Sequence, residues 1–270
     1  MTLSMKEIRA EVLESGGKTP LLRVKELGER FPNSVALRNK EFGIWNEISY
    51  SEFWNRCTYV ASALINFGVN KGDKVAVHSE NRPEWFISDL GIQAAGGVTV
   101  GLYPTNPKSE VEYLLGHSET VIVFAEDQEQ VDKALAVLEN LPFLKKIVYF
   151  DDKGMYKYDS DYLISFEEFL KIGKESLNSN LEQILHTIEH IDDDDLALLV
   201  YTSGTTGPPK GSMITHGNLR WVSGNLVTTV FVESVATKNP QFLSYLPLCH
   251  IFARLTDLLI GTQLIATINF

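Results

Sequence analysis

The stretch LALLVYTSGTTGPPKG, residues 196–211, runs from an apolar segment directly into a loop of small polar residues. Five consecutive apolar residues, 196–200, are typical of a strand that is buried on both faces of a parallel sheet. The next eleven residues hold four Ser or Thr hydroxyls, three glycines, two prolines and Lys210. Such a loop after a strand presents backbone N–H groups and hydroxyls in a concave nest, which suits an anion such as phosphate. We therefore predict an anion-binding loop, with a surface turn as the alternative interpretation.

Two better known loop motifs do not fit the sequence. The Walker A motif G-x-x-x-x-G-K-[ST] fails because the fifth residue after Gly204 is Pro209, and residues 16–19 lack its first glycine. The G-x-S-x-G elbow of serine hydrolases occurs around neither Ser203 nor Ser223. The sequence therefore gives no support to a Walker A site or to serine hydrolysis.

The composition is that of a soluble globular chain. Its 270 residues are 44% hydrophobic, and two cysteines, Cys57 and Cys249, are too few for a disulfide framework. Residues 1–18 lack the apolar core of a signal peptide, and no apolar run reaches the roughly 20 residues that span a bilayer. We expect a cytoplasmic protein with at most peripheral membrane contact, and the sequence leaves the oligomeric state open.

The charge is negative and concentrated in one segment. A formal net charge of −11 argues against nucleic acid as a partner, because affinity for a phosphate backbone comes from clustered Lys and Arg. Residues 151–195 contain 13 acidic residues and four lysines. We interpret this segment as a solvated acidic connection, and residues 1–20 as an N-terminal extension.

Between residues 74 and 150 the chain alternates short β-branched runs with helical patterns. The predicted strands cover residues 75–77, 98–100, 121–124 and 147–150, and the predicted helices cover 83–95, 107–116 and 127–140. Repeated βα units predict an α/β fold in which parallel sheets are covered by helices.

Further elements flank this core. They are a hairpin of strands 36–38 and 45–48, a helix capped by Ser51, a helix from His216, a strand at 242–246 and a helix after Cys249. The chain ends in the apolar run 264–270, which is typical of a core strand, whereas termini are usually exposed and frayed. We therefore expect the chain to be part of a larger fold.

Residues 201–211, YTSGTTGPPKG, resemble the phosphate-binding signature of the adenylate-forming superfamily, which includes acyl-CoA synthetases, luciferases and the adenylation domains of peptide synthetases. Three further stretches resemble the family in the same order: LYPTNP at 102–107 leading to YLLGHSE at 113–119, GSMITHGNL at 211–219 and LPLCHIFAR at 246–254. The front part is most similar to bacterial long-chain fatty acid–CoA ligases. The resemblance implies that residues 21–270 form an incomplete N-terminal AMP-binding domain, without the C-terminal domain.

The resemblance also implies an activity and a set of site residues. Such an enzyme uses ATP to convert a fatty acid into acyl-adenylate, and the CoA thiol then displaces AMP. The ATP phosphates would be held by Thr202, Ser203, Gly204, Thr205, Thr206, Gly207 and Lys210. Mg²⁺ would be bound through the phosphates, with Thr205 or Thr206, and no protein metal site is implied. His250 would act with Lys210 in catalysis, near the acyl carboxylate and the α-phosphate, and Trp221 would line the acyl tunnel.

The sequence departs from the family pattern at two points. Ala253 precedes Arg254 where members of the family usually carry Glu, and the later motifs for adenine and ribose, the hinge and the C-terminal lysine are missing. We therefore expect the 270-residue chain alone to be inactive as a ligase. The alternative is a nucleotide-binding module without catalysis, and the acyl chain length is left open.

Two histidine patterns allow other interpretations. The stretch from His186 to His190 fits the H-x-x-E-H pattern of inverted zinc peptidases, but its acidic surroundings and the lack of a third ligand favour a solvated helix. Cys249 and His250 are poorly placed as nucleophile and base, because neighbours in an extended segment point to opposite faces. A histidine between apolar residues is often a core side chain, and only the resemblance favours a site role for His250.

Overall fold

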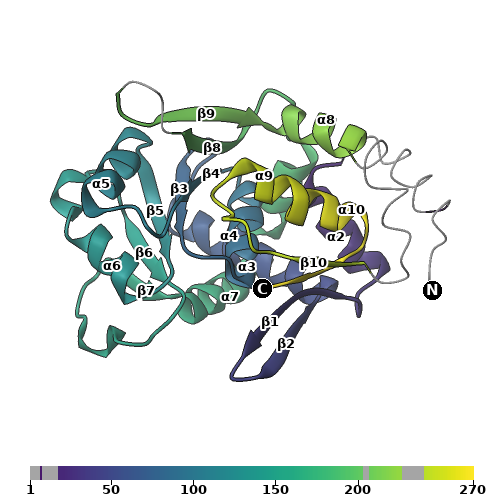
Figure 1. The fold of residues 1–270 in the computed structure, drawn as a ribbon, viewed down its shortest axis with the longest axis horizontal. Helices are drawn as coiled ribbons and strands as arrows, with labels where there is room; N and C mark the ends of the chain where they lie inside the picture. Colours follow the sequence, from purple (N-terminus) through teal and green to yellow (C-terminus); the bar gives the residue numbers. More distant parts are fainter. Residues whose placement is uncertain (1–6, 8–17, 203–206, 227–239) are drawn as a thin grey trace. The chain divides into compact units, whose positions relative to one another are not determined.

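The computed structural model describes residues 7, 18–202, 207–226 and 240–270, and the chain divides into two compact units (Figure 1). Unit 1 comprises Met1–Asn55, Ile191–Asp195 and Thr215–Phe270, and unit 2 comprises Arg56–His190 and Leu196–Ile214. Each unit is built around its own sheet. The domain boundaries predicted above, an extension over 1–20 and a partial domain over 21–270, stay a prediction.

Unit 2 contains a seven-stranded sheet in the order β7-β6-β5-β3-β4-β8-β9. The strands are β3 (Lys74–His78), β4 (Val98–Leu102), β5 (Thr120–Ala125), β6 (Lys146–Tyr149), β7 (Leu163–Ser165), β8 (Leu196–Thr202) and β9 (Lys210–Thr215). From β7 to β8 all neighbouring strands pair in parallel. The predicted α/β fold and its βα repeat are therefore confirmed.

Helices cover both faces of this sheet. They are α4 (Pro83–Ala94), α5 (Lys108–His117), α6 (Gln128–Leu135), α7 (Phe166–Glu189) and the second half of α3 (Tyr50–Asn66). Helix α4 contacts α7 as well as β3 and β4, whereas α5 contacts α6 and β5 (Figure 1). The α5 and α6 side holds one continuous core, in which Val100, Val123 and Leu199 of the sheet meet Leu114 and Val131 of the helices.

The predicted helix over 127–140 is wrong in its second half. Helix α6 starts correctly, because the side chain of Asp127 accepts hydrogen bonds from the backbone N–H groups at its first turn. It ends at Leu135, and Val137 leaves the helical conformation with φ −119° while its side chain is buried. A separate 3₁₀ turn, Leu138–Asn140, follows. Packing of Val137 into the core thus overrides a pattern that reads as one helix.

The acidic segment 151–195 contains more than a connection. Helix α7 spans 24 residues, and the Ser165 side chain caps it by accepting a hydrogen bond from the backbone N–H of Glu168 at 3.2 Å. One face of the helix buries apolar side chains, namely Phe166, Phe169, Leu170, Ile184 and Ile188. Its acidic residues lie on the exposed side. The prediction of a solvated connection therefore missed an amphipathic helix that packs in unit 2, because the acidic residues of its exposed side dominate the composition of the segment.

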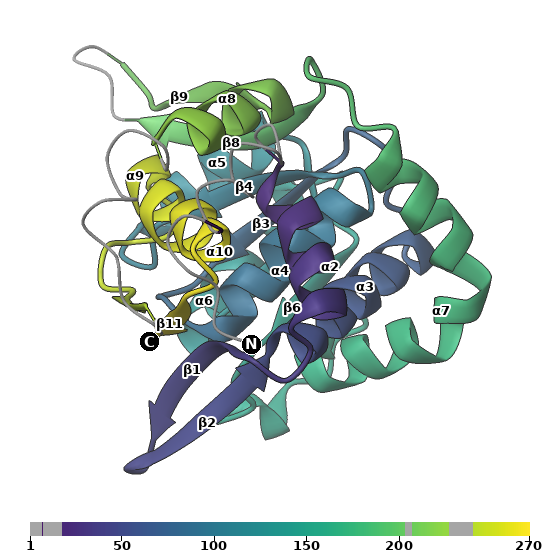
Figure 2. The same cartoon turned by 90° about the vertical axis from the view of Figure 1, so that its right-hand side faces the viewer.

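Unit 1 contains a four-stranded sheet in the order β10-β11-β1-β2. Strands β1 (Val35–Glu41) and β2 (Ile44–Ser49) form the predicted antiparallel hairpin, which extends past its neighbours in Figure 2. Strand β11 (Thr267–Asn269) pairs in parallel with both β1 and β10 (Gln241–Leu243). The apolar end of the chain is thus a core strand as predicted, although β11 and β10 are shorter than the predicted runs 264–270 and 242–246.

The helices of unit 1 pack around this sheet. They are α2 (Pro20–Arg30), the first part of α3, α8 (His216–Leu226), α9 (Ile251–Ala253), a π-helical segment (Arg254–Ile260) and α10 (Gly261–Gln263). The cap of α3 is Ser49 rather than the predicted Ser51, because Ser49 Oγ accepts the N–H of Glu52 at 3.2 Å. In the part of the chain that the structure describes, no helix is both long and apolar enough to cross a membrane.

Candidate functional site

The residues before and after the predicted phosphate loop belong to unit 2. Strand β8 is buried up to Tyr201, and the next residue, Thr202, is exposed. Gly207 has φ +86°, a left-handed conformation that favours glycine. Lys210 begins β9 with an exposed side chain. The remaining predicted phosphate-binding residues, Ser203, Gly204, Thr205 and Thr206, lie outside the described residues.

A cluster of aromatic side chains connects α5 to both flanks of this loop. Tyr113 Oη donates a hydrogen bond to the carbonyl oxygen of Pro209 at 3.0 Å. His117 Nδ1 lies 2.8 Å from Tyr201 Oη, and burial raises the pKa of the Tyr201 phenol to about 12. These α5 residues were not among the predicted site residues. Their only sequence signal was the YLLGHSE stretch, which does not show that α5 reaches the loop.

His250 lies in unit 1 at the start of α9 and has an exposed side chain. Its backbone N–H closes a turn by donating to the Pro247 carbonyl at 2.9 Å. Its Nδ1 accepts the backbone N–H of Phe252 at 3.2 Å. In the neutral ring the proton is therefore on Nε2, which can donate to a carboxylate or phosphate oxygen. The neighbouring Cys249 is buried, which agrees with the rejection of a thiol and base pair.

The π-helical segment after His250 contains a buried acid that sequence reasoning missed. Asp257 is 5% exposed, and its Oδ1 accepts the Thr256 hydroxyl at 2.8 Å. Burial raises the pKa of the Asp257 carboxyl, while hydrogen bonds from Ser244 and Thr256 oppose this shift. The only available signal was an acid inside the apolar run after Arg254. Ala253, at which the sequence was expected to depart from the pattern it resembles, is also fully buried.

Trp221 lies on α8 of unit 1 and is 69% exposed. The helix begins with a reciprocal cap, in which Thr215 and Asn218 each accept the other's backbone N–H through their side chains. The predicted start of this helix at His216 is confirmed. The exposure of Trp221 leaves its predicted role in an acyl tunnel untested.

The rings of His186 and His190 stack on each other with centroids 4.0 Å apart. His190 also bonds through Nδ1 to the His186 carbonyl oxygen at 2.8 Å. Across the described ranges, no group of three or more His, Cys, Asp or Glu side chains could hold a metal ion. The geometry therefore gives the zinc-peptidase alternative no support.

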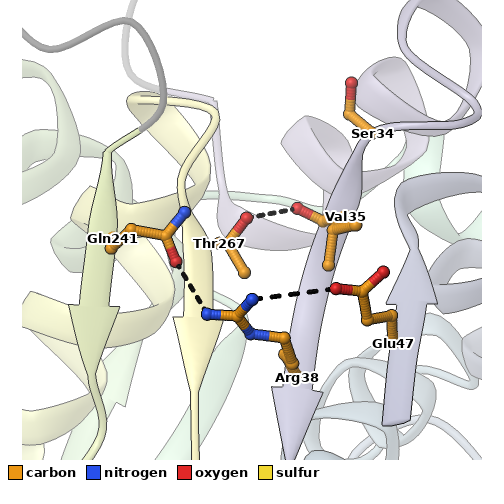
Figure 3. A pocket seen from close by; sticks show the side chains of 6 residues that line it. All are labelled: Ser34, Val35, Arg38, Glu47, Gln241 and Thr267. Atoms are coloured by element: carbon orange, nitrogen blue, oxygen red, sulfur yellow. Dashed lines mark hydrogen bonds and ion pairs between the residues drawn. The ribbon is translucent and has the colours of Figure 1, made fainter. Parts of the chain in front are cut away.

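A polar pocket of about 270 Å³ opens between strands of unit 1 (Figure 3). Its lining residues are Ser34, Val35, Arg38, Glu47, Gln241 and Thr267. The Arg38 guanidinium is 3.7 Å from Glu47, and it donates to Asn269 Oδ1 at 2.8 Å and to Gln241 Oε1 at 3.5 Å. Glu47 offsets the charge of Arg38 and the two amide oxygens accept its hydrogen bonds, which argues against the pocket as an anion site.

The sequence of this chain is similar to a known protein family and to individual members of it. The sequence profile of a family described as AMP-binding enzyme matches residues 24–270. The chain is 34% identical over 234 residues to the long-chain-fatty-acid–CoA ligase ACSBG2 of Xenopus laevis, covering 87% of this chain and 31% of that protein. It is 32% identical over 247 residues to the Homo sapiens protein of the same name, covering 91% and 36%. The chain thus spans about a third of the length of these relatives.

A solved structure agrees with this match at the level of the fold. The anthranilate CoA ligase AuaEII, in complex with anthranoyl-AMP, is similar with a TM-score of 0.73 and 21% sequence identity. The similarity covers 93% of this chain and 44% of that one. The profile match over nearly the whole chain carries the assignment: this protein belongs to the AMP-binding enzyme family.

Proposed function

We propose that this chain forms the N-terminal, ATP-binding part of a long-chain fatty acid–CoA ligase. In the first step the fatty acid carboxylate attacks the α-phosphorus of ATP, and pyrophosphate leaves. In the second step the CoA thiol attacks the acyl carbon, and AMP leaves. The observation that supports this proposal most is the family match over residues 24–270, together with relatives named as long-chain-fatty-acid–CoA ligases.

The proposed roles follow the chemistry of the side chains. The hydroxyls and backbone N–H groups of residues 202–207 bind the β- and γ-phosphates, and Lys210 offsets their charge. His250, with its proton on Nε2, donates to the acyl carboxylate or the α-phosphate. In a longer protein that contains this chain and has ligase activity, His250→Ala should slow adenylation, assayed from fatty acid and ATP, but not thioester formation started from acyl-adenylate. Equal slowing of both steps would contradict this role.

Magnesium is proposed to arrive with the nucleotide. Mg²⁺ prefers oxygen ligands and commonly binds through substrate phosphates with one or two protein groups. Among the described residues no cluster of metal-ligating side chains competes for this role. The low cysteine content supports a reducing, cytoplasmic location. Cell fractionation tests this location. Co-sedimentation with lipid vesicles tests whether the protein makes peripheral contact with a membrane.

The decisive test of the phosphate site is the Lys210→Ala variant. Loss of one hydrogen bond to a charged group is worth about 1.5 to 3 kcal/mol, so we expect MgATP to bind roughly 10 to 150 times more weakly. Isothermal titration calorimetry of the 270-residue chain measures this affinity. Lys153→Ala is the matched control, because Lys153 is also exposed in unit 2 and its ammonium group lies 3.5 Å from the carboxylate of Asp151.

Two outcomes of this titration count against the proposal. If the wild-type chain does not bind MgATP, residues 202–210 are no phosphate site. If Lys210→Ala binds as tightly as Lys153→Ala, the loop binds the nucleotide without this cation. Affinity for MgATP without any ligase activity in a longer protein would favour the alternative of a binding module without catalysis.

A further inference from the structure

Two side chains of α5 contact the chain on both sides of the proposed phosphate loop. Tyr113 donates to the carbonyl oxygen of Pro209, the residue immediately before Lys210, at 3.0 Å. His117 is bonded at 2.8 Å to Tyr201, near the end of β8. All of these residues belong to unit 2. One helix therefore holds the strand that enters the loop and the segment that leaves it.

The rings of this cluster also pack against one another. The centroids of Tyr113 and His117 are 5.3 Å apart, and those of His117 and Tyr201 are 5.8 Å apart in an edge-on arrangement. A Cβ atom at Gly211 would lie 3.2 Å from Cζ of Tyr201. A glycine at this position thus allows β9 to pass closely over the Tyr201 ring. The cluster fixes both flanks by ring contacts as well as by hydrogen bonds.

The hydrogen bond to Pro209 has a specific effect on the next residue. The peptide group that joins Pro209 to Lys210 is planar and trans, so its C=O and N–H bonds point in opposite directions. When Tyr113 holds the carbonyl oxygen toward α5, the Lys210 N–H must point away from α5. The same contact fixes the backbone from which the Lys210 side chain extends.

We propose that Tyr113 is a positioning residue for phosphate binding, which acts by orienting the Pro209–Lys210 peptide group. His117 and Tyr201 hold the opposite flank of the loop in the same frame. The inference rests on the proposed function of the loop, and it adds residues from a different part of the sequence to that site. Tyr113 itself need not touch the nucleotide.

The first experiment measures the positioning directly in the 270-residue chain. The Tyr113→Phe variant keeps the ring and removes only the hydroxyl. Loss of one neutral hydrogen bond changes an equilibrium by roughly two- to tenfold, so hydrogen exchange of the backbone amides of residues 210–212 should accelerate by that factor. Tyr158→Phe is the matched control, since it removes a hydrogen-bonded hydroxyl elsewhere in unit 2. Unchanged exchange in Tyr113→Phe would overturn the inference.

The second experiment asks whether this positioning matters for the nucleotide. Tyr113→Phe should bind MgATP roughly two to ten times more weakly than the wild type, while Tyr158→Phe, which also loses a hydrogen-bonded hydroxyl, binds normally. If Tyr113 acts through Lys210, the loss should be smaller when Tyr113→Phe is added to Lys210→Ala. If the wild type and Tyr113→Phe bind MgATP with equal affinity, the role of Tyr113 is overturned but the proposed function of the loop is not. No affinity in the wild type would overturn the proposed function and the inference with it.

Discussion

His78 is the last residue of β3 in unit 2, and the folded structure disfavours protonation of its side chain. Its side chain is fully buried, and Nε2 lies 3.1 Å from the Tyr103 carbonyl oxygen. Burial, followed by the charge of Lys133, lowers the pKa of His78 to about 4. The folded pKa is below the unfolded value, so the unfolded chain binds more protons between about pH 6.5 and pH 4. We therefore expect the contribution of His78 to lower the free energy of unfolding by about 3 kcal/mol as the pH is lowered from about 6.5 to 4.

Urea unfolding at several pH values measures this loss in the wild type and in His78→Gln. The variant is needed because burial raises the pKa values of Glu126 and Asp257, which favours the folded state at low pH. The difference between the two proteins should therefore carry the His78 contribution. The control His186→Gln replaces an exposed histidine and shows what the same substitution does away from β3. A His78→Gln profile parallel to the wild type would contradict the assignment.

Candidate site residues could be proposed from the sequence only where a short motif identifies them, and their roles stay predictions. Lys210 and His250 stand in short motifs, and both are exposed in the structure, as a substrate contact requires. Tyr113 and His78 could not be predicted in this way. Their roles depend on partners that are distant in sequence, such as Pro209, and no local pattern reports such contacts.

At the scale of elements, the contact between α7 and α3 depends on one glycine. A Cβ atom at Gly173 would lie 1.8 Å from the backbone carbonyl oxygen of Tyr59, far inside van der Waals contact. To make room the two helices must move apart, which disturbs contacts between them such as the Ser62–Ser176 hydrogen bond at 2.8 Å. We expect Gly173→Ala to destabilise the protein by about 3 kcal/mol or more, the upper end of the range for overpacking.

Thermal and urea unfolding test this expectation against Gly116→Ala. Gly116 also lies in a helix, and its added Cβ would approach no atom closer than 3.8 Å. There the better helix propensity of alanine should leave stability unchanged or raise it by up to about 1 kcal/mol. If the two variants have the same stability, the close approach at Gly173 does not constrain the α7 packing.

The elements themselves were predicted well where one local signal dominates. The β-branched runs became β3 to β6, and the two short strands predicted at 36–38 and 45–48 became the β1–β2 hairpin. Predictions failed where tertiary packing or composition competes with the local pattern. Val137 breaks the predicted helix by entering the core, and the acidic face of α7 concealed its apolar face.

At the scale of the whole molecule, the share of its relatives' length that this chain covers bears on the proposed activity. The chain spans 31% and 36% of the length of two relatives named as ligases. We predict that the 270-residue chain forms no acyl-CoA from palmitate, ATP, Mg²⁺ and CoA, which mass spectrometry of the products measures. More than one acyl-CoA per chain, lost in Lys210→Ala, would contradict this prediction. Activity that survives in Lys210→Ala would indicate a contaminating enzyme.

The strand order of unit 2 determines when β8 can join its sheet during synthesis. Strands β3 to β7 pair with neighbours that are close in sequence, whereas β8 joins β4 through pairs such as Thr99 and Leu198. All five earlier strands therefore leave the ribosome before β8. Until then the buried apolar strand β4 has an open edge, a kind of surface that promotes aggregation of nascent chains. The strand that carries the proposed phosphate loop is thus also the one that protects this edge.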